Sequence, residues 1–194
     1  MNPLNATIIT IGDELLIGQV IDTNSAFIAQ ALSKIGIPVT QRIAVGDSKD
    51  TITEALDTAS KKSSIVILTG GLGPTADDIT KPLLNEYFGG KMVIHEPSLA
   101  HITHIFETIH KKPMIERNRK QAEVPDVCEV LFNEKGTAPG MLFIKEGVHY
   151  FSLPGVPHEM KWLIETKVIP LLQKKFKTDY ILHKTLLTAG LGES

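Results

Sequence analysis

The first third of the chain alternates short apolar runs with longer amphipathic segments. Residues 6–11 and 64–68 are mostly apolar and β-branched, as in strands covered on both faces, whereas residues 37–47 alternate apolar and polar side chains. Residues 22–36 and 48–62 repeat apolar positions at helical spacing, and each begins with residues suited to cap a helix. The order strand, helix, strand, helix, strand predicts a parallel sheet with right-handed crossovers.

The middle of the chain is predicted to be richer in helix and less regular. Residues 79–88, 95–110 and 115–122 have helical patterns, and residues 91–96 have the composition of a strand. The pattern contains no internal repeat and no segment of low complexity.

A hairpin and a long helix are expected toward the end of the chain. Residues 141–153 predict the hairpin, with its turn at Glu146-Gly147. Residues 155–176 predict the helix, which Pro170 is expected to kink or divide. The residues from 181 onward begin as a further strand.

Composition narrows the class of protein. Twenty basic and 22 acidic residues among 194 leave a net charge of −2, so nucleic acid is not an expected partner. No apolar run is long enough to span a membrane and the N-terminus lacks the pattern of a signal peptide, which predicts a cytoplasmic protein. Cys128 is the single cysteine, so no disulfide can form within one chain and a buried thiol is expected.

Four glycine- or proline-containing loops follow the predicted strands. They are residues 12–18, 45–48, 69–78 and 152–160. Ligands of open α/β sheets bind beyond the carboxyl ends of the strands, and glycines and helix starts there let a ligand approach backbone N–H groups. The acids that we single out, Asp13, Glu14, Asp47, Asp77 and Asp78, lie on three of these loops. We therefore expect the loops to converge on one acidic site.

Carboxylates beside a phosphate loop make electrostatic sense if a divalent cation bridges the two. The loop residues Gly70, Gly71, Gly73 and Thr75 are predicted to hold a phosphate. The acids Glu14, Asp47 and Asp78 are predicted to hold the metal or to orient a water. This is the layout of metal-assisted phosphoryl or pyrophosphate chemistry.

Each charged residue also has a structural interpretation. Asp78 is placed to cap a helix that begins at Ile79, and Asp47 follows Gly46 as in an ordinary turn. The basic stretch at residues 111–120 is typical of a solvated face, although it would also suit the phosphates of a nucleotide. The catalytic interpretation depends on the joint placement of the acids.

A dinucleotide-binding fingerprint is imitated by residues 71–76, which match G-x-G-x-x-A after a strand, with Glu96 about twenty residues on. Pro74 has no N–H for a pyrophosphate, and Asp77 and Asp78 place negative charge where it would sit. A nicotinamide-dinucleotide fold is therefore a weaker hypothesis than either metal-assisted pyrophosphate chemistry or a binding module without catalysis. The Gly-Lys-Ser/Thr ending of a P-loop is absent as well.

Several separated motifs, "GDELLIG…DTNS", "TGGLGPTADDIT", "NEKGTAPGM" and "LPGVPHEM", resemble the N-terminal domain of the CinA family of competence/damage-inducible proteins. That domain belongs to the molybdopterin-binding superfamily with the MogA, MoaB and MoeA-like proteins. The resemblance covers roughly residues 6–176 and implies a three-layer α/β/α sandwich with a mostly parallel sheet. It also implies metal-dependent hydrolysis of ADP-ribose to AMP and ribose 5-phosphate, whereas other relatives bind molybdopterin at the equivalent edge.

The resemblance assigns roles residue by residue. Asp78 matches the acid after the glycine loop, Asp47 the acid after the second strand, and Glu14 the acid of the G-D-E-L motif. Asp77 departs from the MogA-like branch, which favours CinA-type chemistry over pterin handling. The resulting assignment makes Asp47 and Asp78 catalytic and Glu14, Asp47 and Asp78 metal ligands. The predicted phosphate- or nucleotide-binding residues are Gly12, Asn24, Gly70, Gly71, Gly73, Thr75, Asn133 and Gly155.

The remaining expectations also follow from the resemblance. The cofactor would be a divalent ion such as Mg²⁺, Mn²⁺ or Co²⁺, with a monovalent cation as a further candidate, and the protein would form a homodimer. Residues 1–176 would be the domain and residues 177–194 the truncated start of a linking domain, without the nicotinamide mononucleotide deamidase of full-length members. A non-catalytic module that binds molybdopterin or a nucleotide remains the alternative to the hydrolase.

Overall fold

A six-stranded sheet forms the centre of the computed structural model, which describes residues 4–75 and 78–177. Across the sheet the strands are β2 (Val39–Val45), β1 (Ala6–Ile11), β3 (Ile65–Thr69), β8 (Val148–Leu153), β7 (Gly140–Lys145) and β6 (Glu129–Leu131). The first four are parallel, whereas β7 runs antiparallel to β8 and to β6. The predicted parallel strand–helix alternation is confirmed, with β1 between β2 and β3.

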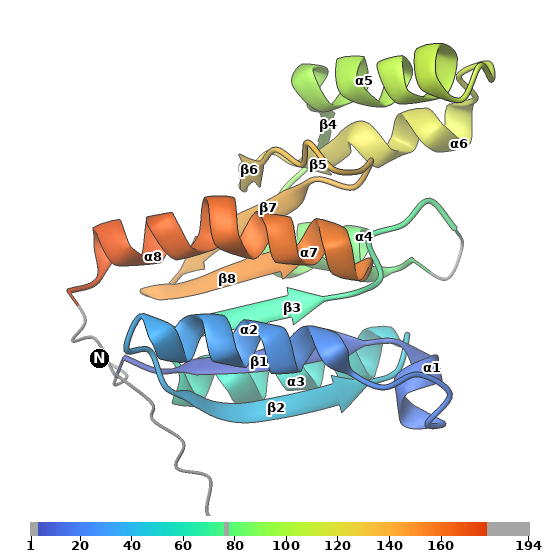
Figure 1. The fold of residues 1–194 in the computed structure, drawn as a ribbon. Coiled ribbons are helices and arrows are strands. Elements are labelled where there is room, and N and C mark those ends of the chain that lie inside the picture. The colour runs from blue at the N-terminus through green and yellow to red at the C-terminus, as the bar shows by residue number, and fades with distance from the viewer. Residues whose placement is uncertain (1–3, 76–77, 178–194) are drawn as a thin grey trace, which may run out of the picture.

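Helices cover both faces of this sheet (Figure 1). The covering helices are α2 (Thr23–Lys34), α3 (Lys49–Lys62), α4 (Thr80–Phe88), α7 (Pro157–Leu163) and α8 (Ile169–Lys175). Side chains of α2, α7 and α8 share one buried cluster, and those of α3 and α4 share the other. The three-layer α/β/α sandwich is therefore confirmed.

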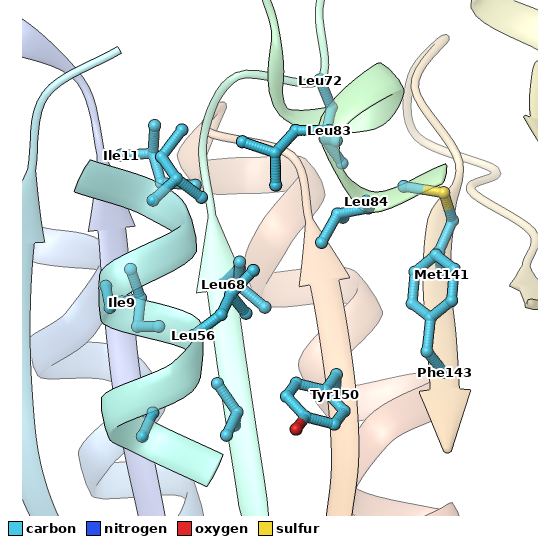
Figure 2. Packing of buried hydrophobic residues seen from close by; sticks show 14 of the residues in the cluster. Ile9, Ile11, Leu56, Leu68, Leu72, Leu83, Leu84, Met141, Phe143 and Tyr150 are labelled. Carbon is cyan, nitrogen blue, oxygen red and sulfur yellow. The ribbon is translucent and has the colours of Figure 1, made fainter. Parts of the chain in front are cut away.

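Neighbouring residues of a central strand contribute to opposite layers. In β1, Ile8 packs with α2 and α7, whereas Ile9 packs with α3 and α4. Figure 2 shows the second of these clusters, in which Leu56 of α3 and Leu84 of α4 meet the face of β3 and β8. Because helices exclude water from both faces of the sheet, its central strands are continuous apolar runs in the sequence.

Helix starts at the carboxyl edge are capped by the residues that the sequence suggested. The Asp22 carboxylate accepts the Ser25 N–H at 2.9 Å at the start of α2. Ser48 caps α3, accepting the Thr51 N–H at 3.4 Å. These caps place both helix starts beside the ends of β1 and β2.

The middle of the chain forms a small unit of its own beside the sandwich. Its two antiparallel strands are β4 (Met92–Ile94) and β5 (Glu123–Pro125), and its helices are α5 (Glu96–Thr103), the π-helical η1 (His104–Ile109), α6 (Glu116–Arg119) and the 3-10 turn η2 (Lys120–Ala122). The predicted helices and the strand β4 are confirmed. Strands β5 and β6 and the short α1 (Asp13–Leu16) were not predicted, because three- and four-residue elements carry too little pattern.

The last helix is continuous but changes its geometry. A π-helical segment, η3 (Ile164–Val168), lies between α7 and α8 and ends two residues before Pro170. The helix is therefore not divided at Pro170, and its change of geometry near this residue is the π-helical segment. The strand expected from residue 181 lies outside the described residues. Within residues 4–75 and 78–177, no helix is both long and apolar enough to span a membrane.

Candidate functional site

A cavity of about 380 Å³ opens at the carboxyl edge of the parallel strands, and we call it the edge cavity. It is lined by Thr10, Ile11, Gly12, Glu14, Leu15, Val20, Ile21, Asp22, Thr23, Asn24, Asp47, Thr69, Gly70, Gly71, Asp78, Gly155 and Pro157. These residues come from all four of the loops that the sequence singled out. Of the predicted site residues, eight line this cavity, namely Gly12, Glu14, Asn24, Asp47, Gly70, Gly71, Asp78 and Gly155.

Three predicted residues lie elsewhere. Gly73 lines a smaller adjoining hollow of about 290 Å³, which we call the side cavity. Thr75 hydrogen-bonds to Asp78 within the glycine loop. Asn133 is buried, and its amide donates to Ala138 O and to the carboxylate of Glu159.

Two loops of the edge cavity are joined through a pair of aspartates. The Asp13 N–H donates to Asp47 Oδ2 and the Asp47 N–H donates to Asp13 Oδ1, both at 3.1 Å. The exchange fixes the loop after β1 against the loop after β2, and it brings two carboxylates close together. Asp13, predicted as a member of the acidic site, is thus a partner that orients Asp47.

Asp47 is held in an unfavourable environment for its charge. Burial raises the pKa of its carboxyl above the ordinary value, and the nearby carboxylates of Asp13, Glu14 and Asp78 raise it further, while the Asp13 N–H lowers it. A carboxylate that is harder to keep charged binds protons and cations more readily. Asp47 is therefore suited to accept a proton or to hold a cation.

Asp78 organises the glycine loop rather than the following helix. Its Oδ1 accepts the Gly73 N–H at 2.8 Å, and its Oδ2 accepts the Thr75 N–H at 2.9 Å. Helix α4 begins at Thr80 with Ile79 as its cap residue, and no side chain of the described residues caps it. The cap interpretation of Asp78 is therefore wrong. In this arrangement the N–H groups of Gly73 and Thr75 donate to the Asp78 carboxylate, and their role as phosphate donors stays a prediction.

Two other predicted backbone donors are also engaged. The Gly12 N–H donates to Val45 O at 3.0 Å, and the Gly70 N–H donates to Leu153 O at 3.2 Å. Both bonds continue the sheet at its edge, where four strands end together. In this arrangement the two N–H groups are therefore bonded within the sheet edge rather than free for a phosphate.

The glycines of the site make room for acids. A Cβ atom on Gly12 would overlap the Glu14 carboxylate, and one on Gly73 would overlap that of Asp78. The same relation joins Gly46 to Asp13 and Gly136 to Glu159. These glycines therefore mark places where a carboxylate packs against the backbone. From the sequence alone, the same glycines suggest the close approach of a ligand.

Asn24 ties three segments together at the cavity floor. Its Nδ2 donates to Gly155 O at 2.8 Å and to Thr69 Oγ1 at 3.2 Å, and Thr69 Oγ1 donates to Pro154 O at 2.8 Å. Asn24 Oδ1 is buried and accepts no hydrogen bond from the described residues. An orphaned acceptor at the cavity wall favours a ligand that brings a hydroxyl, an amino group or a cation.

The predicted metal ligands share the cavity without forming a finished cage. Among the described residues, no three carboxylates, imidazoles or thiolates are grouped closely enough to hold a metal ion. Mg²⁺ is commonly bound by one or two carboxylates together with substrate phosphates and water, rather than by an all-protein cage. The cavity wall carries the hard carboxylate oxygens of Glu14, Asp47 and Asp78, and two of these carboxylates fit an ion of that kind, provided that the ion shares its ligands with a phosphate.

A basic residue of the middle segment reaches the glycine loop. Arg117 Nε donates to Pro74 O at 3.1 Å, so part of the stretch 111–120 lies beside the loop that carries Asp78. The dinucleotide fingerprint is not supported by the fold, because Glu96 begins α5, beyond β4 of the separate two-stranded sheet.

Lys81 is a buried cation that sequence analysis missed, since a lysine at the start of a helix gives no signal of burial. Its side chain on α4 is 6% exposed, and its Nζ donates to Gln121 O at 2.9 Å. Burial lowers the pKa of Lys81 to about 8, against opposing effects of Glu123, Asp78 and Cys128. Lys81 thus places a positive charge behind the glycine loop.

We expect Lys81 to give the protein a characteristic alkaline pH dependence. The folded-state pKa of about 8 lies below the unfolded value of 10.5, so the unfolded chain binds more protons between these values and the free energy of unfolding rises with pH there. The contribution is about 2 kcal/mol between pH 8 and pH 10. Urea unfolding of the parent and of Lys81→Met across this range measures it as a difference. A difference that does not change with pH would contradict the assignment.

A larger hollow of about 770 Å³ lies at the opposite edge of the sheet, beside the β7–β8 turn. Its polar groups bind one another, since the Tyr87 hydroxyl donates to Asp57 at 2.8 Å and Lys145 Nζ lies 4.5 Å from the centre of the Tyr87 ring. The edge cavity is therefore the stronger candidate site, in agreement with the usual position of ligands in open α/β sheets.

The fold and the site together define a three-layer α/β domain with an acidic ligand cavity at the carboxyl edge of its parallel strands. Solved structures of this class include MoaB, a tungsten cofactor synthesizing protein from Pyrococcus furiosus, with a TM-score of 0.58 and 20% identity over 90% of this chain and 98% of that one. At that identity the likeness establishes the fold alone.

The family model described as "Probable molybdopterin binding domain" matches residues 7–174. The crystal structure of CinA from Thermoplasma acidophilum is 34% identical, with a TM-score of 0.76 over 90% of this chain and 99% of that one. The chain therefore belongs to the molybdopterin-binding-domain family and, within it, to the CinA proteins.

Curated relatives agree with this assignment. A CinA-like protein of Flavobacterium psychrophilum is 54% identical over 98% of this chain, and a competence-damage inducible protein of Clostridioides difficile is 44% identical over 98%. The chain spans less than half of their length, 46% and 45% respectively.

Proposed function

We propose that the edge cavity binds ADP-ribose together with a divalent cation, and that the domain hydrolyses the pyrophosphate to AMP and ribose 5-phosphate. The observation that carries the proposal is the charge of the cavity wall. Glu14, Asp22, Asp47 and Asp78 line it, and among the described residues its lining includes no lysine, arginine or histidine. A pyrophosphate can enter such a site only with a cation that offsets the repulsion.

Each acidic side chain has its own role in this proposal. Glu14 and Asp78 would hold the ion, which when bound would neutralise charge on the phosphate oxygens. Asp47, whose pKa is raised, accepts a proton from the attacking water. The water oxygen forms a new bond to phosphorus, and the bridging P–O bond breaks so that its oxygen leaves with the other phosphate. Asp13 keeps the Asp47 carboxylate in position through their paired N–H bonds.

A binding module without catalysis is the second candidate. It is favoured by the absence of a finished three-residue metal cage among the described residues and by the engagement of Asp78 with its own loop. Such a module would bind molybdopterin or a nucleotide at the same edge and release it unchanged. The two candidates differ in turnover rather than in the position of the ligand.

Ligand binding is expected to depend on the cation. Titration calorimetry with ADP-ribose, in Mg²⁺ and then after chelation, should show affinity falling at least about tenfold without the metal, because the carboxylates then repel the pyrophosphate directly. Adenosine, which has no phosphate, is the matched ligand whose binding should not follow the metal. Equal affinity for ADP-ribose with and without chelator would contradict the proposal.

A further inference from the structure

The side cavity continues the edge cavity behind the glycine loop. Gly71, Asp78 and Gly155 belong to the walls of both. The remaining lining of the side cavity is Leu72, Gly73, Pro74, Gln121, Thr137, Ala138, Pro154, Val156 and Glu159. A ligand whose phosphates lie at the shared wall would therefore extend into both hollows.

Glu159 supplies a buried carboxylate to the side cavity. The residue lies in the first turn of α7 and is 9% exposed. Its Oε2 accepts a hydrogen bond from Asn133 Nδ2 at 2.6 Å, and Asn133 Nδ2 also donates to Ala138 O at 2.9 Å. Gly136 lies against the same carboxyl group, with no room for a Cβ atom between them. The carboxylate is thus fixed from two sides.

This carboxylate can accept more hydrogen bonds than the surrounding donors of the described residues supply. An ionised carboxylate can accept about four hydrogen bonds, of which the Asn133 amide supplies one. Burial raises the pKa of Glu159, and the Asn133 hydrogen bond opposes this. A buried carboxylate of this kind gains most from strong neutral donors such as hydroxyl groups, which form short charge-assisted bonds with it.

The two cavities offer different side chains to the two ends of a ligand. The wall of the edge cavity includes Leu15, Val20 and Ile21, which suit a flat aromatic base. The side cavity is lined mostly by apolar residues, and its polar side chains include Thr137 and Glu159, which suit hydroxyl groups. The fixed carboxylate of Glu159 therefore assigns the hydroxyl-bearing end of the ligand to the side cavity.

We propose that the side cavity recognises the ribose 5-phosphate half of the substrate, with the Glu159 carboxylate accepting hydrogen bonds from two neighbouring hydroxyls of the sugar. The inference rests on the proposed function, because it assumes a pyrophosphate at the wall shared by the two cavities. It makes Glu159 a specificity-determining residue and defines the substrate class as phosphates of sugars that carry a vicinal diol.

The test compares ribose 5-phosphate with 2-deoxyribose 5-phosphate by calorimetry in the presence of Mg²⁺. Loss of one charge-assisted hydrogen bond should weaken binding of the deoxy sugar about tenfold in the parent protein. In Glu159→Gln the ratio of the two affinities should fall close to one. Glu165→Gln, an exposed glutamate of η3, is the matched control and should keep the parent ratio.

A second variant tests the position of the carboxylate rather than its charge. Gly136→Ala pushes the Glu159 carboxyl group aside and should lower the same ratio, even if Glu159→Gln fails to fold. A parent protein that binds both sugars equally, or variants that keep the parent ratio, would overturn the proposal. Sugar discrimination without any hydrolysis of ADP-ribose would support this site and contradict the proposed hydrolase.

Discussion

Replacing Asp47 by asparagine is expected to lower the turnover of ADP-ribose by a factor of about 10² or more, because the amide can neither accept the proton of water nor hold a cation as a charged ligand. The variant should fold normally, since the asparagine oxygen can still accept the Asp13 N–H. Its free energy of unfolding at neutral pH should rise slightly, because burial and three neighbouring carboxylates oppose the charge of Asp47. Steady-state kinetics and urea unfolding of the same preparation measure both effects.

Asp50→Asn is the matched control for this substitution. Asp50 lies three residues away, exposed in the first turn of α3 and outside the edge cavity. Its variant should retain the turnover of the parent. An Asp47→Asn protein with parent-like turnover would show that the acid has a structural role alone.

Gly70→Ala is expected to be the most destabilising single substitution at the site. Gly70 has a φ of +117°, which alanine adopts only with strain, and a Cβ there would overlap the carbonyl oxygen of Ile11. Because Ile11 ends β1, relief of the overlap would separate two neighbouring strands where the cavity begins. We expect a loss of about 2–4 kcal/mol of unfolding free energy, or roughly 6–12 °C in Tm.

Gly147→Ala measures the cost of backbone strain without steric overlap. Gly147 has a φ of +81° in the β7–β8 turn, and no atom lies within 4 Å of a Cβ placed there. Its alanine variant should lose only about 1 kcal/mol, the cost of the backbone conformation alone. Equal losses in thermal unfolding of the two variants would contradict the role given to the Ile11 contact.

The sandwich was predictable because its strands and helices carry strong periodic signals. Continuous apolar runs such as residues 64–68 occur where both faces of a sheet are covered, and the alternation with helices fixed the parallel direction. The convergence of the four loops followed from that direction. Short elements such as β6 were missed, because three residues carry too little pattern and their pairing, here with β7, depends on the partner strand as well as on their own residues.

The interior of the site was less predictable, because hydrogen bonds do not appear in a sequence pattern. Nothing in the spacing of Gly73, Thr75 and Asp78 distinguishes a loop that holds a phosphate from a loop that holds its own carboxylate. Burial of Glu159 and Lys81 was equally hidden, since both lie among exposed-looking helical residues. For the carboxylates, the glycines of the loops carry a signal, because Gly136 faces the carboxylate of Glu159 and Gly73 faces that of Asp78.

Product analysis decides whether this domain cleaves a pyrophosphate. The protein is incubated with ADP-ribose in the presence of Mg²⁺, Mn²⁺ or Co²⁺, and the products are separated by chromatography. Our account predicts equal amounts of AMP and ribose 5-phosphate, formed in proportion to the parent protein and lost in Asp47→Asn. ADP-ribose that binds but is recovered intact with every one of these metals would contradict the account and leave a binding module in its place.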